Sequence, residues 1–297
     1  MSQTAVKTTE TFNMRTKQLQ WKTFFISLLK NKMACVGTVI ILFFVLIAFI
    51  GPTVAPHNPT ETNMLNRSEG PTAEHWFGTD NNGRDIFSRI LHGARLTLYI
   101  GLLSVGIGAL AGIILGLISG YYGRWIDTVI MRTADVLLAF PGILLALAIV
   151  SALGPSLNNV IIALSIYNIP IFARIVRAST LEVRKLEYVE SVRALGAGDG
   201  KIIFQHILPN ITSPIIVQAT LQIAVSIISA AGLSFLGLGA QPPIPEWGAM
   251  LSGGRNYMWN APHITLFPGL AILLVVLGFN LLGDGLRDVL DPRTKQS

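Results

Sequence analysis

Histidines and a cysteine are the side chains of this sequence that could bind a metal ion or serve as bases and nucleophiles. The single cysteine, Cys35, has no second thiol with which to form a disulfide or a thiolate site. No His-Glu-x-x-His zinc motif occurs in the chain. We therefore predict no metal site and expect the histidines to be solvated. The five histidines lie outside the long apolar segments, mostly singly in polar stretches: His57, His75, His92, His206 and His263.

Energy-coupling chemistry is also missing from the sequence. No glycine-rich loop ends in Gly-Lys-Ser or Gly-Lys-Thr, so the chain has no nucleotide site of its own. Ionisable residues are rare within the apolar segments, and Asp135 and Asp284 lie near the ends of theirs. An ion-coupled carrier would need such charges along its pathway. We expect no catalysis and no directly bound cofactor, so that energy for any work comes from a partner.

Composition places the chain in a membrane. Of its 297 residues, 51% are apolar and only 13% are charged, whereas soluble domains are about 25% charged. About 20 apolar residues cross the roughly 30 Å hydrocarbon layer as a helix. We predict an all-α membrane protein with six transmembrane helices, the third interrupted by Pro141-Gly142 and the fourth containing Pro170. The predicted spans are residues 34–50, 96–119, 133–153, 160–175, 211–236 and 266–286.

The distribution of lysine and arginine orients these spans. Alternating sides give 17 basic residues on one side and 5 on the other, out of 22. The positive-inside rule puts the richer side, with both termini, in the cytoplasm, so the net charge of +6 does not indicate nucleic acid. The predicted organisation is a cytoplasmic tail with an interfacial amphipathic helix (1–33), a first transmembrane helix (34–51), an extracytoplasmic segment (52–95), a five-helix core (96–288) and a cytoplasmic tail (289–297).

Two patterns within the spans indicate helix contacts. Small residues at every fourth position let another helix approach closely in lipid, and the second span carries such a stripe, whose partner is either a helix of this chain or a second subunit. Gln218 and Gln222 share one face of the fifth span, where they could line a polar pathway or hydrogen-bond a neighbouring helix; both interpretations stay open. Asn168 is a further pathway candidate. The glycine stripe is Gly108, Gly112, Gly116 and Gly120.

The polar loop 176–210 is long for a connection between packed helices, which usually spans about 2–8 residues. Its pattern predicts a short helix over 190–195, a glycine break at 196–198 and a second helix over 201–207, which Leu208-Pro209 stops. The spacing of Glu190, Gly196 and Leu208-Pro209 resembles the cytoplasmic EAA loop of binding-protein-dependent ABC importer permeases, the segment that contacts the ATPase. The sequence departs from that pattern at Ser191, Val192 and His206. The resemblance implies a docking loop made of Tyr188, Glu190, Ser191, Arg193, Ala194, Gly196, Ala197, Leu208 and Pro209.

A second resemblance lies before the second span. Residues 75–89 read HWFGTDNNGRDIFSR, which resembles the signature of the C-type permease subunit of dipeptide and oligopeptide importers. Residues 230–248 and 280–288 are similar to other signatures of this family. We expect Trp247, within the former, to lie in an interfacial aromatic belt. The residues that carry the first signature are Gly78, Thr79, Asp80, Gly83, Arg84 and Asp85.

The resemblance implies a type I ABC importer permease fold and a set of partners. These are a second permease subunit, two cytoplasmic ATPases that bind ATP-Mg, and an extracytoplasmic substrate-binding protein, assembled at a bacterial inner membrane. Dipeptides, oligopeptides, glutathione and nickel complexes remain open as substrates. Residues 140–146 and 261–263 are most similar to glutathione and dipeptide importers. An ion-coupled secondary transporter and a receptor or assembly scaffold without a pathway are the alternatives.

Overall fold

The computed structural model describes residues 27–290. The predicted tails and most of the interfacial helix expected before residue 33 lie outside this range. Within it the chain is helical and contains no strand. The helices are α2 (Lys32–Val54), α3 (Ile86–Tyr122), α4 (Arg124–Leu138), α5 (Gly142–Leu153), α6 (Leu157–Val183), α7 (Glu187–Ala194), α8 (Asp199–Lys201), α9 (Thr212–Phe235), α10 (Trp247–Gly254) and α11 (His263–Leu290).

Five of the six predicted membrane spans are single helical runs in the described residues, and the remaining one is a bent pair of helices. Five helical runs are long and apolar enough to cross a bilayer: α2, α3, α6, the run from Asp199 to Phe235 that ends in α9, and α11. The sixth is the pair α4 and α5, which passes the same test but is bent by 89°. The all-α membrane architecture is therefore confirmed for the described part of the chain.

Two predicted boundaries were wrong. α3 begins at Ile86 rather than near residue 96, because the Asp85 carboxylate accepts a hydrogen bond from the Ser88 amide at 2.7 Å and caps the helix. The return loop expected over 121–132 is instead helical from Arg124 onward. Its charged residues are compatible with a helix because Asp127 pairs with Arg177 of α6.

The interruption at Pro141-Gly142 is a complete break between α4 and α5. Proline has no amide hydrogen and disfavours helical backbone at the preceding residue, which ends α4 before it. Pro170 lies inside α6 and Pro268 inside α11 without ending either helix. Proline therefore marks a break at one of these three positions only.

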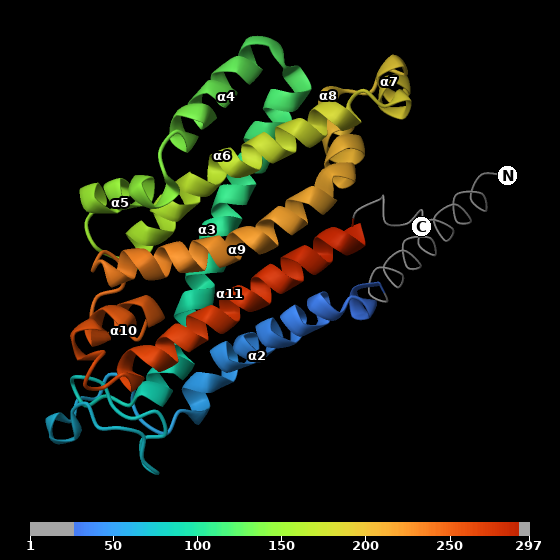
Figure 1. The fold of residues 1–297 in the computed structure, drawn as a ribbon. Coiled ribbons are helices and arrows are strands. Elements are labelled where there is room, and N and C mark those ends of the chain that lie inside the picture. Colours follow the sequence, from blue (N-terminus) through green and yellow to red (C-terminus); the bar gives the residue numbers. More distant parts are fainter. Residues whose placement is uncertain (1–26, 291–297) are drawn as a thin grey trace.

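α3 runs through the molecule and packs along α6 (Figure 1). All four glycines of its stripe face α6: a Cβ at Gly112 would lie 2.6 Å from the Ile169 carbonyl oxygen, and one at Gly116 would lie 2.6 Å from that of Ala173. Gly108 and Gly120 meet Asn168 and Thr180 equally closely. The partner of the stripe is thus a helix of this chain.

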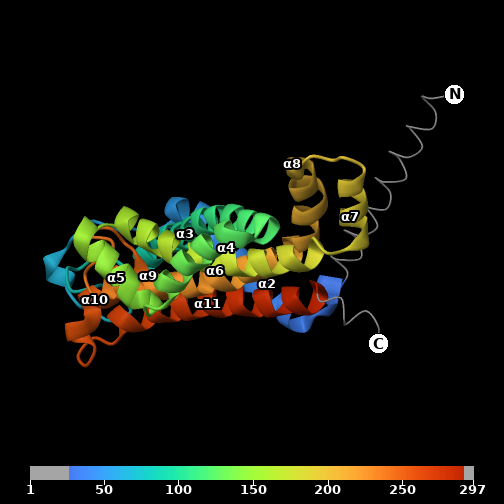
Figure 2. The same cartoon turned by 90° about the horizontal axis from the view of Figure 1, so that it is seen from above.

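The two ends of the bundle differ. The start of α2, the end of α11 and α7 lie at one end, whereas α5, α10 and residues 55–85 lie at the other (Figures 1 and 2). We call residues 55–85 the outer segment. The sequence predicts that the loop 176–210 and the outer segment lie on opposite sides of the membrane. Their positions at opposite ends of the bundle agree with that assignment.

Candidate functional site

α7 projects from the bundle and ends in a left-handed turn (Figure 2). Gly196 has φ of +84°, a conformation that glycine adopts without steric cost. The Ala197 amide donates to the Val192 carbonyl at 3.3 Å, and the Gly196 amide donates to that of Arg193 at 2.9 Å. This is the hydrogen-bond pattern of a glycine-terminated helix. The predicted break at residues 196–198 is therefore present.

One side of α7 is anchored to the bundle. Val189 is fully buried and packs with residues of α3, α6 and the start of the α9 run. Behind it, Tyr121 Oη donates to the Asp199 carboxylate at 2.6 Å, and the Arg193 guanidinium lies 5.4 Å from the centre of the Tyr121 ring. The buried members of this cluster are Leu117, Tyr121, Val176, Val189, Ile202, Ile203, Ile207, Ile211 and Ile215.

The opposite side of α7 is open. Leu195, at its end, is 87% exposed, and the neighbouring charged and polar side chains are exposed with it. The structure thus places the predicted docking residues from Tyr188 to Ala197 on α7 and the turn after it, and Leu208 and Pro209 at the start of the α9 run. Their contact with an ATPase stays a prediction. Of the predicted residues, Ala197 and Leu208 are half-buried, and Tyr188, Glu190, Ser191, Arg193, Ala194, Gly196 and Pro209 are exposed.

The prediction that Leu208-Pro209 stops the second helix was wrong. The chain continues as one helical run from Asp199 to Phe235. It passes through a π-helical segment, Ile202–Ile207, and a 3₁₀ turn, Leu208–Ile211, before α9. Pro209 lies in the first turn of the 3₁₀ segment, where its missing amide hydrogen costs no helical bond. This segment is therefore continuous with α9.

Hydrogen bonds join α7 to this run. Tyr188 Oη donates to the His206 carbonyl at 3.2 Å. Asn210 Nδ2 donates to Tyr188 Oη at 3.1 Å and to the same carbonyl at 2.6 Å. The exposed tyrosine therefore links the projecting helix to the base of a membrane span.

The pathway candidates lie between α6 and α9. Asn168 and Gln222 are buried, and Gln222 Nε2 donates to Asn168 Oδ1 at 2.8 Å. Asn168 Nδ2 in turn donates to Ser226 Oγ at 3.2 Å. Gln218 donates to Gln222 at 3.3 Å and also lines a hollow of about 500 Å³ that includes Arg287. The amides hold two helices together in this chain, and pathway lining stays a prediction.

The outer signature contains a cluster of buried charged side chains, Asp80, Arg84 and Arg89, at the start of α3. We call it the Asp80 cluster. The Asp80 carboxylate accepts hydrogen bonds from the Arg84 amide at 3.0 Å and from Arg84 Nε at 2.7 Å. Arg89 lies 3.6 Å from the same carboxylate and donates to the carbonyls of Pro59 and Pro243. All three charged side chains are buried. The Asp80 cluster therefore connects the outer segment to α3 and to the loop between α9 and α10.

The remaining signature residues determine the backbone conformation around the Asp80 cluster. Gly83 has φ of +71°, and a Cβ there would lie 1.7 Å from the Asn63 carbonyl oxygen, so only glycine fits. Thr79 Oγ1 accepts from the Glu69 amide at 3.0 Å and donates to the Asn66 carbonyl. Gly78 has φ of +75°. These residues fold the segment, and none of them lies on an element that projects from the bundle as α7 does.

Two expectations about single residues fail at this end. Trp247 is fully buried rather than interfacial, because its Nε1 donates to the Ile90 carbonyl at 3.1 Å and its ring packs on Phe44. His75 is buried rather than solvated, and its Nδ1 lies 2.9 Å from Asp85 Oδ1. Trp247 and Ile90 are 157 positions apart, and His75 and Asp85 are 10 positions apart within an irregular loop. Neither contact follows from a helix or strand pattern.

Comparison with known proteins identifies the family. Residues 112–296 match the family described as binding-protein-dependent transport system inner membrane component. Residues 20–71 match the N-terminal transmembrane domain of oligopeptide transport permease C. The chain belongs to this family of ABC importer permeases. The permease is thus a multi-pass inner-membrane protein, and its relatives are transport subunits rather than enzymes.

Curated relatives match the permease over nearly its full length. The dipeptide transport system permease protein DppC of Alkalihalophilus pseudofirmus is 56% identical over 93% of this chain and 90% of that protein. The glutathione transport system permease protein GsiD of Pectobacterium atrosepticum is 51% identical over 93% of this chain and 92% of that protein. These matches confirm the resemblance to the peptide-transport branch of the family.

Solved structures confirm the fold. The inward-facing MetNI methionine ABC transporter matches with a TM-score of 0.55 at 20% identity, over 68% of this chain and 96% of that chain. An amino acid ABC transporter matches with a TM-score of 0.52 at 19% identity, over 66% and 91%. The permease therefore has the type I importer fold that the sequence predicted.

Sequence reasoning missed the residue that anchors α7. Val189 is the apolar residue that faces inward from an otherwise polar helix. Its signal was a pair of valines, Val189 and Val192, among charged and polar residues, a pattern too short to establish periodicity. The pairing of Asp127 with Arg177 on α6 was also missed, because the two residues are 50 positions apart and Asp127 was placed in a loop.

Proposed function

We propose that the permease forms one half of the membrane pathway of a peptide importer, beside a second permease subunit. Two cytoplasmic ATPases bind ATP-Mg and supply the energy, and an extracytoplasmic binding protein delivers the substrate. The strong basic bias of the face that carries α7 supports a cytoplasmic location for this helix and for both termini.

The exposed face of α7 is the observation that carries this proposal. A helix of eight residues is too short to be stable alone. α7 is anchored to the bundle by the buried Val189, and it projects with Leu195 87% exposed. Exposed apolar residues beside charged ones mark a protein interaction surface. Since α7 occupies the position of the EAA loop, the partner that fits is the ATPase.

The contacts between α7 and the bundle provide a route by which movement of the ATPases reaches the membrane helices. Closure of the ATPases would move α7, and the Val189 cluster and the Tyr188–Asn210 hydrogen bond would pass this movement to α6 and α9. Because these helices are joined along their length by the Asn168–Gln222 contact, they move as one body. The expected result is a rigid-body switch between inward- and outward-facing pathways.

Peptides are the substrate class that the relatives favour. The relatives named above transport dipeptides and glutathione, according to their names. A nickel complex is the alternative substrate within this family. An ion-coupled carrier is disfavoured because Asp135 of α4 forms an exposed ion pair with Arg174 at 2.8 Å instead of presenting an unpaired, buried charge.

Affinity purification in mild detergent, followed by mass spectrometry, tests the assembly. We expect a second permease and ATPases to accompany the wild type, and the ATPases to be lost when Glu190 and Gly196 are both replaced. A variant of Gly198, which has ordinary extended backbone, is the matched control and should retain all partners. Recovery of the permease without an ATPase would contradict the proposal.

Uptake assays on the purified complex test the substrate. In proteoliposomes with the binding protein, uptake of dipeptides or glutathione should require ATP and should persist when the ion gradient is dissipated. ATP-dependent uptake of a nickel complex but of no peptide would instead establish the alternative substrate.

A further inference from the structure

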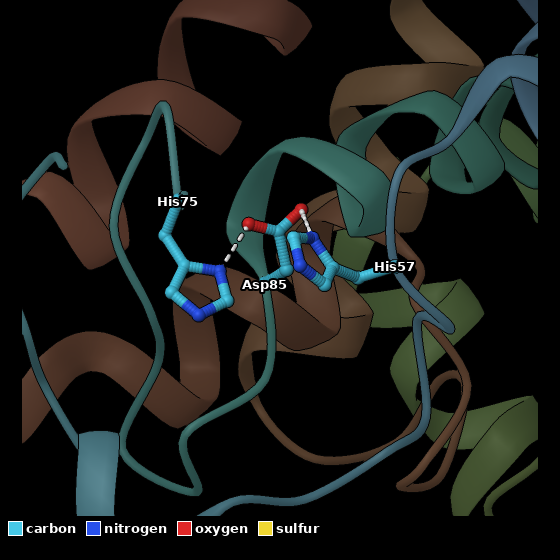
Figure 3. Close-up of side chains that lie close together, drawn as sticks. All are labelled: His57, His75 and Asp85. Carbon is cyan, nitrogen blue, oxygen red and sulfur yellow. Dashed lines mark hydrogen bonds and ion pairs between the residues drawn. The ribbon is translucent and has the colours of Figure 1, made fainter. Parts of the chain in front are cut away.

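Three side chains from three parts of the outer segment converge at the start of α3 (Figure 3). His57 follows α2, His75 lies within the segment, and Asp85 precedes α3. Their candidate donor atoms, one from each residue, all lie within 4.8 Å of one another. Figure 3 shows both imidazole rings directed toward the same carboxylate. Two imidazoles and a carboxylate form a donor set typical of zinc sites with three protein ligands.

The distances fit a small cation. His75 Nδ1 lies 2.9 Å from Asp85 Oδ1, and His57 Nδ1 lies 3.8 Å from Asp85 Oδ2. Zinc bonds of about 2.0–2.2 Å in tetrahedral geometry place donor atoms roughly 3.3–3.6 Å apart. The two measured separations bracket this value. The third separation, between the donor atoms of the two histidines, is at most 4.8 Å.

One donor has no other role in the described structure. His57 Nδ1 is buried and has no hydrogen-bond partner, although 32% of the side chain as a whole is exposed. A buried polar atom without a partner carries a free-energy cost of about 1–3 kcal/mol. The two imidazole rings also lie close together, with centroids 4.7 Å apart. An ion between the rings and the carboxylate would satisfy the orphaned nitrogen.

The ligands are held in place by their surroundings. Asp85 is almost fully buried, and its Oδ2 accepts from the Ser88 amide at 2.7 Å. The Ser88 hydroxyl accepts from the His57 amide at 3.1 Å, which fixes the loop after α2 on the same helix turn. The His75 amide donates to Thr72 Oγ1 at 2.9 Å. Such outer contacts orient metal ligands before the ion arrives.

A hollow borders one of the three proposed ligands, His57. A hollow of about 520 Å³ is lined by His57 together with neighbouring residues of the same loop and by His92 of α3. Three protein donors leave a fourth tetrahedral position for water from this side. We propose that His57, His75 and Asp85 bind a zinc ion that clamps the outer segment to the N-terminus of α3. This revises the sequence-based expectation of solvated histidines and no metal.

Metal binding to the full-length permease in nanodiscs tests the proposal. The protein is stripped with a chelator, exposed to zinc chloride, freed of loose metal and measured by mass spectrometry for zinc content. We expect about one ion per chain, the stoichiometry of a single site. Competition with a chromophoric chelator should show that His57→Ala weakens binding by more than the roughly 10–100-fold that loss of an outer-shell partner costs.

Two further variants separate ligation from folding. Asp85→Asn keeps an equally good helix cap but removes the anionic donor, so zinc binding should weaken while the circular dichroism spectrum is unchanged. His92→Ala removes a histidine that borders the same hollow but lies outside the cluster, and it should bind zinc as the wild type does. Equal zinc retention by wild type and His57→Ala would overturn the proposal.

X-ray absorption at the zinc edge gives an independent answer. The wild type should show scattering from two imidazole rings, with light donors at about 2.0–2.1 Å, and His57→Ala should show fewer than two. A wild-type spectrum without imidazole scattering would overturn the proposal even if zinc were retained.

Discussion

Tyr188 of α7 accepts a hydrogen bond from Asn210 at the base of the α9 run, with 3.1 Å between Oη and Nδ2. The same hydroxyl donates to the His206 carbonyl at 3.2 Å. The two bonds join the exposed helix α7 to a membrane span through a single side-chain oxygen. They are therefore the contacts most directly able to convert movement of α7 into movement of α9.

Replacing Tyr188 with phenylalanine removes both bonds and keeps the ring. Each net hydrogen bond contributes about 0.5–1.5 kcal/mol. The loss of both corresponds to about 1–3 kcal/mol, so we expect peptide uptake per ATP hydrolysed to fall at least roughly 5-fold while the complex still assembles. The measurement is the ratio of uptake to hydrolysis in proteoliposomes. Tyr99→Phe, at an exposed tyrosine of α3, serves as the control and should keep the wild-type ratio.

Gly196→Val tests the turn that ends α7. A left-handed φ costs a non-glycine residue roughly 1–2 kcal/mol, and nothing lies within 4 Å of a Cβ at this position, so the effect is conformational rather than steric. We expect membrane insertion to persist while ATP hydrolysis is uncoupled from uptake. Gly198→Val is the matched control, because Gly198 has φ of −69° and equally open surroundings. Normal uptake by Gly196→Val would refute the docking assignment.

The spans and the turn at Gly196 could be predicted because each depends on neighbouring residues: length, apolarity and a glycine after a helical pattern. The burial of Trp247 could not, because it depends on a carbonyl 157 positions away. The helical passage through Pro209 was missed for a related reason. Proline alone indicates a stop, and only packing of the flanking isoleucines into the Val189 cluster keeps the run continuous.

For the candidate sites, too, the sequence predicted one property and missed another. Spacing located the docking loop and the outer signature, but it did not distinguish an exposed motif from a buried one. Asp80 and Arg84 form a buried pair within the outer segment, whereas Glu190 projects from α7 in solvent. That difference depends on which elements pack over each motif, and local sequence does not contain it.

Gly112→Ala tests the contact between α3 and α6. The new Cβ would lie 2.6 Å from both the Ile169 carbonyl oxygen and Phe172 Cβ, so the helices must separate. Overpacking of this kind costs typically about 1–3 kcal/mol, and we expect a lower unfolding temperature of the purified permease. Gly106→Ala adds the same methyl group to α3 where nothing lies within 4 Å, and it should unfold as the wild type does.

Asn168→Ala separates the two interpretations of the buried amides. The substitution leaves Gln222 and Ser226 without their partner, which costs about 1–3 kcal/mol. If the amides serve helix contact, stability falls, and Asn168→Leu combined with Gln222→Leu restores part of it by removing the unpaired Gln222 amide as well. Uptake by this double variant decides the matter: uptake near that of the wild type supports helix contact, and stable protein without uptake supports a pathway role.

Glu246 gives the outer end of the permease a pH dependence. Burial raises the pKa of this carboxyl above its ordinary value, although amide hydrogen bonds from Gly248 and Ala249 oppose the shift. Because the folded state then binds the proton more tightly than the unfolded state, the stabilisation is fully present below the unfolded pKa and is lost as pH rises through the folded pKa. We expect the unfolding temperature to fall over this interval, by about 2–4 °C per kcal/mol. Glu246→Gln cannot ionise and should flatten the profile; an unchanged slope in that variant would assign the dependence to another group.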